Sequence, residues 1–213
     1  MTHRLLLSCT TGLLLGLALA CGGSSSAPTA TTQKAATGLA YTDPTGAAGW
    51  RLVKDASSTP NRIVLNLVGP TGLRTRGVGF NLQAPSTVRF GRFANGTALG
   101  DTGVYQLLSV GSVDPSEPVA LMGGVKAGNV LTAGIYQKDR GQTAPDSGAA
   151  LCQIAIVFDA SKGLGTGDTL ALRVLKAKVI PEDIGTVTDD LLTLDKKLTM
   201  ADITIAIGSL SAQ

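Results

Sequence analysis

Among the side chains suited to nucleophilic chemistry, one thiol lies well inside the chain. Cys152 stands in the most apolar segment, between Leu151 and Ile154, and the only histidine in the sequence is His3. A catalytic cysteine needs a base such as histidine to form its thiolate at neutral pH. We therefore expect Cys152 to be a small buried apolar side chain, rather than a nucleophile or half of an intermolecular disulfide.

Two pairs of acidic residues are the candidates for acid–base catalysis. Glu182 is followed by Asp183, and Asp189 by Asp190. Glycoside hydrolysis requires two carboxyl groups opposed across a cleft, whereas adjacent acids in a turn-rich segment are typical of solvated loops. The sequence thus predicts neither an enzyme nor a cofactor, and a carboxylate-dependent glycan hydrolase is the least favoured alternative.

A glycine-rich segment, Gly163–Asp168, follows Asp159. A phosphate-binding loop would continue with a lysine and a helix, but the residues after Asp168 are typical of a strand. A calcium site would need several oxygen ligands at fixed offsets. We expect a hairpin turn here, and a weak calcium site near Asp159 and Asp168 is the alternative.

Four arginines would form a small basic patch if their strands pair. Such a patch could contact anionic lipid or lipopolysaccharide, although isolated arginines on the outer face of a sheet usually just remain solvated. They are Arg74, Arg76, Arg89 and Arg92.

The N-terminal segment has the pattern of a secretion signal. Met1–Arg4 is short and basic, and Leu5–Ala20 is apolar but too short to span a membrane comfortably. We expect residues 1–20 to be a signal peptide. Beyond Cys21 no stretch reaches the eighteen or so apolar residues of a membrane-spanning helix.

The end of this signal reads Ala18-Leu19-Ala20-Cys21-Gly22. It resembles the lipobox of bacterial lipoprotein precursors, although Ala18 replaces the usual leucine. The resemblance implies cleavage before Cys21, lipidation of Cys21 and a stable membrane anchor. Because Gly22 is not aspartate, it also implies the outer membrane of a two-membrane cell, on its periplasmic or cell-surface face. The alternative is a secreted protein, cut after Ala20, in which Cys21 stays a free thiol.

Residues 21–38 consist mainly of Gly, Ser, Ala, Thr and Pro. Such a segment cannot bury enough apolar surface to become ordered. We expect a flexible tether that reaches roughly 20–25 Å on average. Residues 39–213 then form a single domain, because a chain of this length supports one substantial core.

Alternating apolar residues predict half-buried strands from Tyr41 onward. Ile63, Leu65 and Leu67 share one face of such a strand, and glycine and proline turns separate it from the next. Further strands are expected in residues 50–56, 78–82, 87–93, 104–110, 119–125, 130–137, 151–158, 169–180 and 203–210.

These strands, without amphipathic helices between them, predict an all-β fold. We expect an antiparallel β-sandwich of about nine to ten strands, jelly-roll-like rather than a closed barrel. Residues 181–197 form either one or two helical turns or a plain loop.

Two series of short segments follow one another along the chain: Arg62–Val68, Arg76–Leu82 and Val88–Phe90, and later Ala150–Phe158 and Gly167–Leu172. The first series resembles the opening strands of cohesin modules, which are related to carbohydrate-binding modules, and the second series is similar to their paired late strands. The resemblance covers about residues 50–180 and rests on strand rhythm and small residues. It implies a jelly roll that works by binding rather than catalysis; cohesins recognise dockerin partners through a sheet face.

The formal net charge is only +3, and the basic residues are scattered. This argues against a nucleic-acid partner. We expect a membrane-anchored lipoprotein whose non-catalytic β-sandwich binds or scaffolds an envelope protein or polysaccharide. The alternative is a structural component of an outer-membrane or envelope assembly, joined through exposed strand edges.

Overall fold

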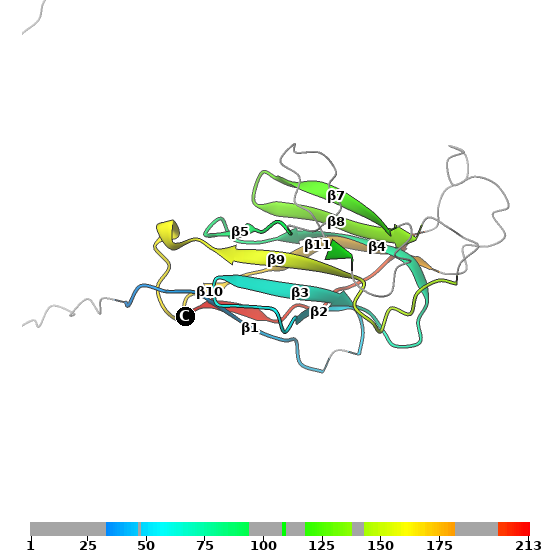
Figure 1. The fold of residues 1–213 in the computed structure, drawn as a ribbon, viewed down its shortest axis with the longest axis horizontal. Helices are drawn as coiled ribbons and strands as arrows, with labels where there is room; N and C mark the ends of the chain where they lie inside the picture. The colour runs from blue at the N-terminus through cyan, green and yellow to red at the C-terminus, as the bar shows by residue number, and fades with distance from the viewer. Residues whose placement is uncertain (1–32, 47, 94–107, 110–117, 138–142, 182–199) are drawn as a thin grey trace, which may run out of the picture. The chain divides into compact units, whose positions relative to one another are not determined.

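The computed structural model describes residues 33–46, 48–93, 108–109, 118–137, 143–181 and 200–213, which belong to one compact unit, Gln33–Gln213. Thirteen strands and a short 3₁₀ turn, η1 (Ala160–Lys162), form its regular structure (Figure 1). The strands are β1 (Leu39–Thr42), β2 (Arg51–Lys54), β3 (Arg62–Val68), β4 (Thr75–Gln83), β5 (Val88–Phe90), β6 (Leu108–Ser109), β7 (Pro118–Lys126), β8 (Val130–Gln137), β9 (Cys152–Phe158), β10 (Thr169–Leu170), β11 (Arg173–Pro181), β12 (Ala201–Asp202) and β13 (Ser209–Ala212).

The strands pair into three sheets. The first has the order β12-β11-β4-β8-β7, the second the order β2-β3-β9-β5 with β6 also on β9, and the third the order β1-β13-β10. Every pairing between these strands is antiparallel. The prediction of an all-β antiparallel sandwich is confirmed.

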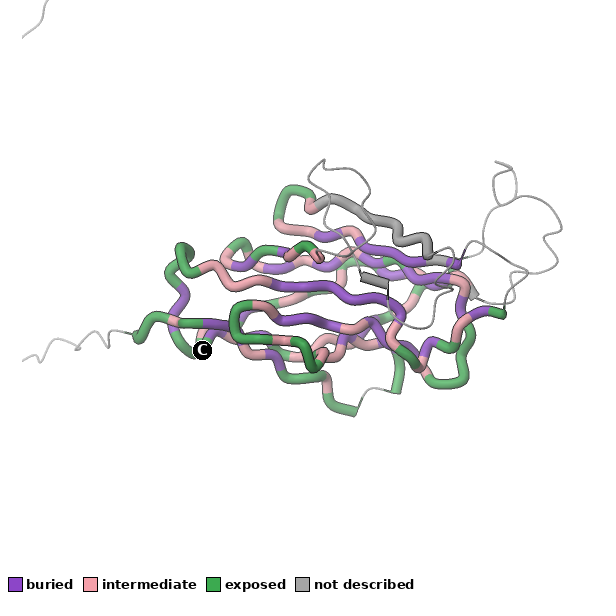
Figure 2. The backbone as a smooth tube through the Cα atoms, in the orientation of Figure 1, coloured by how far each residue is buried: buried purple, intermediate pink, exposed green. Residues whose placement is uncertain are grey.

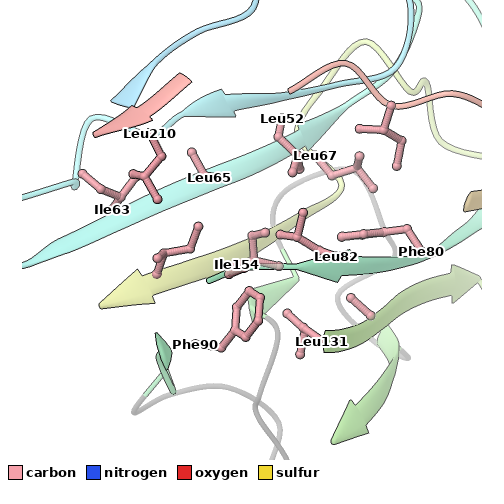
Figure 3. Packing of buried hydrophobic residues seen from close by; sticks show 14 of the residues in the cluster. Leu52, Ile63, Leu65, Leu67, Phe80, Leu82, Phe90, Leu131, Ile154 and Leu210 are labelled. Atoms are coloured by element: carbon pink, nitrogen blue, oxygen red, sulfur yellow. The ribbon is translucent and has the colours of Figure 1, made fainter. Parts of the chain in front are cut away.

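The core lies between the first and second sheets. Ile63, Leu65 and Leu67 of β3 are at most 1% exposed, as their alternation predicts. In Figure 3 Leu67 lies across from Phe80 and Leu82 of the opposite sheet, and Ile63 lies beside Leu210 of β13. Burying each large aliphatic side chain contributes about 1.5–3 kcal/mol, so this layer supplies most of the driving force for folding. Figure 2 shows the buried residues following the inner strands.

Strand register places the connections at two opposite ends of the sandwich. At the proximal end, residues 33–38 join the fold beside residues 159–168, the turns 84–87 and 127–129, and Gln213. At the distal end, residues 69–74 lie against residues 143–150. A nine-residue strand such as β4 separates the two ends by about 30 Å.

Three expectations for individual elements are wrong. Residues 169–180 form two strands in different sheets, because β10 pairs with β13 and β11 with β4. Residues 203–208 are no ladder strand; they make one isolated parallel bridge, Arg51 to Ala206. The glycine-rich segment is a crossover between sheets rather than a hairpin turn. The helix or loop expected at residues 181–197 lies almost wholly outside the described residues.

Candidate functional site

The expected lipidation site, Cys21, lies outside the described residues, as do the carboxylate pairs at 182–183 and 189–190. The structure does show where the chain that follows Cys21 joins the sandwich. No helix in the described part is long and apolar enough to cross a membrane.

Residues 33–38 are hydrogen-bonded into the proximal end. The N–H of Ala36 donates to the carbonyl oxygen of Leu164 at 2.8 Å, and the N–H of Thr37 donates to that of Gln213 at 2.6 Å. The N–H of Gln213 donates in return to the carbonyl oxygen of Gly38 at 2.9 Å. These six residues, from the segment expected to be a tether, therefore belong to the folded unit.

The Asp168 carboxylate fixes the start of this segment. Its Oδ1 accepts a hydrogen bond from Gln33 Nε2 at 3.0 Å, and its Oδ2 accepts one from the N–H of Gly165 at 2.8 Å. Gln33 Nε2 also donates to the carbonyl oxygen of Thr166 at 2.9 Å. The carboxylate thus links the incoming chain to the crossover.

The second candidate calcium ligand has a different local role. Asp159 Oδ1 accepts hydrogen bonds from the N–H and Oγ of Ser161, at 3.1 and 2.6 Å, and so caps η1. Chiefly the Ser161 side-chain hydrogen bond, followed by the backbone one, lowers the pKa of this carboxyl. No three acidic, histidine or cysteine side chains gather into a metal-binding group in the part of the chain that the structure describes.

An open cavity of about 410 Å³ lies at the proximal end, between the turns 84–87 and 127–129 and the start of β11. Its walls are held by Asn129, whose backbone φ is 53° and whose Nδ2 donates to the carbonyl oxygens of Pro85 and Val88 at 2.8 and 2.9 Å. The cavity is lined by Gln83, Ala84, Pro85, Ser86, Gly128, Asn129, Ala171 and Arg173.

Five exposed cations surround this end, and we refer to them as the basic rim. Cross-strand pairing runs from Lys126 through Val130 and Gln83 to Arg173, so Lys126 and Arg173 share the outer face of the first sheet. The basic rim consists of Lys34, Arg89, Lys126, Lys162 and Arg173.

The expected patch of four arginines is wrong. Arg74 precedes β4 at the distal end, where its guanidinium donates to the carbonyl oxygen of Ala144 at 2.8 Å. Arg89 lies opposite Val157 at the proximal end of β9. Arg74 and Arg76 belong to the distal start of the first sheet, whereas Arg89 lies in β5 of the second sheet and Arg92 follows it, so the four arginines do not form one patch.

Cys152 is a core residue. It is 1% exposed and lies opposite Leu67 in the second sheet. Burial raises the pKa of its thiol to about 12, so the thiolate needed for nucleophilic attack is not formed at neutral pH. The expectation of a small buried side chain agrees with this position.

The outer side of the first sheet carries a row of polar residues. Lys176, Asn81 and Thr132 form one row across β11, β4 and β8. The next row places Lys178 beside Gly79 and Gly134, with Lys178 Nζ 3.0 Å from the Asp202 carboxylate. The sequence did not single out this surface, because each strand contributes only every second residue to it.

Neither a known protein family nor a characterised protein matches the chain. Among solved structures, it is similar to a non-cellulosomal cohesin from the hyperthermophilic archaeon Archaeoglobus fulgidus, with 12% identity, a TM-score of 0.38, and coverage of 63% of this chain and 80% of that one. It is also similar to the seventh ScaB type I cohesin from Pseudobacteroides cellulosolvens, with 9% identity, a TM-score of 0.41, and coverage of 75% and 92%. Both similar structures are cohesin domains.

Proposed function

We propose that the chain is a lipoprotein, anchored through Cys21, whose β-sandwich is a non-catalytic binding or scaffolding module of the cell envelope. The observation that carries the proposal is the hydrogen-bonded seating of residues 33–38 beside Gln213 at the proximal end. A chain held at Cys21 is thereby connected to one defined end of a rigid sandwich.

The surface best suited to a partner is the polar outer side of the first sheet. Gly79 lies opposite Gly134 at its centre, and a methyl group added at Gly79 would meet only the carbonyl oxygen of Ala133, at 3.8 Å. Asn81 and Lys176 flank these glycines with hydrogen-bond donors. Such a polar sheet surface fits an extended envelope protein segment or a polysaccharide chain.

The anchor is tested by growing cells with an alkyne analogue of palmitate and fractionating their membranes. The wild-type chain should carry the label and sediment with the outer membrane, and Cys21→Ser should lose both the label and the membrane association. An unlabelled wild-type chain would refute the anchor.

The binding role is tested by crosslinking the anchored protein in its own cells. Lys176→Glu combined with Asn81→Asp should abolish capture of the partner, whereas Lys54→Glu, on β2 in the second sheet, should leave it unchanged. Equal capture by all three proteins would remove this sheet face from the proposal.

A structural role in an envelope assembly is the second candidate, and one strand favours it. β7 is nine residues long and, among the described strands, pairs only with β8. A long strand edge can accept a strand from another chain. One partner that co-purifies in fixed ratio, and is lost when a proline replaces Leu121, would favour this role over that of a binding module.

A further inference from the structure

We propose that the proximal end is a docking surface for an anionic phospholipid membrane, so that the sandwich stands on the bilayer rather than floating above it. This inference rests on the proposed lipid anchor for its place in the cell. The surface itself is a property of the described residues and can be tested without the anchor.

Charge at the proximal end is unevenly distributed. Lys34, Lys162 and Arg89 surround the crossover and β5, and Lys126 and Arg173 end the outer row of the first sheet. All five are exposed. The cations therefore come from both main sheets, from the crossover that leads from the second sheet to the third, and from the incoming chain. The positive charge thus belongs to the whole end rather than to one strand.

The two carboxylates of the crossover both accept hydrogen bonds from neighbouring residues. Asp168 is bonded to Gln33 and to the N–H of Gly165, and Asp159 to the N–H and Oγ of Ser161. Lys162 and Arg89 also lie near enough to Asp159 to lower the pKa of its carboxyl. These acids hold the end together and offset only part of its positive charge.

The open cavity offers a place for one phosphate-bearing headgroup. Arg173, Ser86 and Gln83 are among its lining residues. A guanidinium pairs with phosphate oxygens through two parallel hydrogen bonds, while the hydroxyl and amide suit a polar headgroup such as glycerol. A volume of about 410 Å³ accommodates such a group.

The place where residues 33–38 enter the fold favours a membrane as the partner of this surface. Residues 33–38 join the fold at the basic rim itself, so a lipid attached before them keeps this end closer to the bilayer than the other. Two membrane attractions, the acyl anchor and the basic surface, then act on the same side of the molecule. A soluble polyanion would gain nothing from this coincidence.

The first experiment uses the mature chain, residues 21–213, carrying Cys21→Ser, and sedimentation with lipid vesicles. It should bind vesicles of phosphatidylglycerol mixed with phosphatidylcholine, and not vesicles of phosphatidylcholine alone. Binding should weaken steeply as salt is raised, because the Debye length shrinks from about 30 Å at 0.01 M to about 10 Å at 0.1 M. Equal binding to both vesicles, or to neither, would overturn the proposal.

A matched pair of arginine variants locates the surface. Each cation close to an anionic membrane strengthens partitioning about fivefold, so Arg173→Glu should weaken binding by at least that factor. Arg74→Glu changes the charge equally at the distal end, about 30 Å away along β4, and should stay within about twofold because salt screens it. Equal losses in both variants would overturn the proposal.

A triple variant, Lys34→Glu, Lys126→Glu and Lys162→Glu, should weaken binding by at least about a hundredfold. The triple variant should remain folded, because none of the three side chains is buried. A thermal unfolding transition like that of the unsubstituted chain is the control. Inorganic phosphate should not reduce vesicle binding when the total ionic strength is held constant by lowering the concentration of the other salt. Competition by phosphate alone would show a small-anion site instead, and would overturn the membrane assignment.

The outcomes separate this inference from the proposed function. If the wild-type chain is labelled at Cys21 but the Cys21→Ser variant does not bind phosphatidylglycerol vesicles, the anchor is supported and the docking surface is refuted. If the wild-type chain carries no label on Cys21 but the variant still binds these vesicles in a way that depends on Arg173, the anchor is refuted and the docking surface is supported.

Discussion

Two side chains in the core carry ionisable protons that the fold holds in place. Burial raises the pKa of the Cys152 thiol to about 12. Burial also raises the pKa of Tyr41 to about 12, against the opposing effect of the hydrogen bond from the N–H of Gly208. Tyr41 Oη accepts that bond at 2.7 Å and donates to the carbonyl oxygen of Leu52 at 3.0 Å. It therefore ties β2 to the segment that leads into β13.

The first prediction concerns the reactivity of Cys152. In the mature chain, residues 21–213, carrying Cys21→Ser, Cys152 is the one remaining thiol. A thiol reagent at pH 8 should leave it unmodified in the native protein and modify it fully in guanidinium chloride, because the native thiol is both inaccessible and protonated. The measurement is the absorbance of the released thiol with time. Rapid modification in the native state would contradict the burial of β9.

The second prediction concerns stability at alkaline pH. The unfolded chain releases the Cys152 and Tyr41 protons near their ordinary pKa values of 9.0 and 10.0, while the folded chain keeps them until about pH 12. The unfolded state thus binds fewer protons in this window, so the free energy of unfolding should fall as pH rises from about 9 to about 12. Urea titrations across this range measure the slope.

Two variants test whether Tyr41 and Cys152 cause this pH dependence of the free energy of unfolding. Tyr41→Phe should cost about 1–3 kcal/mol at neutral pH, since it leaves the Gly208 N–H and the Leu52 carbonyl unpaired, and it should flatten the decline above pH 10. Cys152→Ala should flatten the part that begins near pH 9. A decline as steep in the double variant as in the wild type would assign the pH dependence to other groups.

At the same scale, sequence reasoning placed Cys152 in the core but could not assemble the basic rim. Cys152 is surrounded by apolar neighbours in the sequence itself, so its burial is a local property. Lys34, Lys126 and Arg173 come from three distant segments, and only the pairing of β7, β8, β4 and β11 brings the last two into one row. The expected arginine patch failed for the same reason, because it assumed a pairing that the sheets do not have.

At the scale of elements, apolar alternation predicted where strands form but not what they pair with. Residues 203–208 alternate as a strand should, and Ile205 is buried. Their backbone instead exchanges hydrogen bonds with β2 and its neighbour: the N–H of Leu52 donates to the carbonyl oxygen of Ala206, whose own N–H donates to that of Trp50. A pattern of side chains cannot distinguish this isolated bridge from a ladder.

The third prediction tests the turn into β13. A methyl group added at Gly208 would overlap the carbonyl oxygen of Thr42, which is backbone and cannot rotate away. Gly208→Ala should therefore lower the free energy of unfolding by about 1–3 kcal/mol or more, by displacing β13 from β1. Urea denaturation measures the loss.

Gly79→Ala is the matched control for that change. The site has open space above it, and its φ is not in the left-handed region. The substitution should change stability by no more than about 0.5 kcal/mol. A similar loss in both variants would mean that the effect comes from the loss of glycine itself rather than from the close approach of Thr42.

At the scale of the whole molecule, the first and last segments of the folded unit meet at the proximal end. Residues 33–38, the crossover and Gln213 all lie at the proximal end, and the inner strands run from there to the distal turns (Figure 1). The sequence indicated a sandwich, but not that both ends of the folded unit meet. That contact joins residues far apart in the chain, and it defines an axis for the molecule.

The fourth prediction is that this axis stands upright on a membrane. Ala160 at the proximal end and Ala149 at the distal end are both exposed, so Ala160→Cys and Ala149→Cys can each carry a dye while the buried Cys152 stays unlabelled. With the acylated lipoprotein in phosphatidylglycerol-containing vesicles and an acceptor dye on the lipids, energy transfer should be much stronger from residue 160. The two dyes should differ in height by about 30 Å, the length of the inner strands.

The upright orientation is tested by comparing the two transfer efficiencies at low and high ionic strength. Raising the ionic strength screens the basic rim without cleaving the lipid, so a docked sandwich should detach and the two transfer efficiencies should approach one another. In phosphatidylcholine vesicles they should be close from the start. If the dyes instead transfer equally in every lipid and at every salt concentration, the sandwich tumbles freely about its tether. The proximal end would then be only a point of attachment, and the partner could be met by any face of the domain.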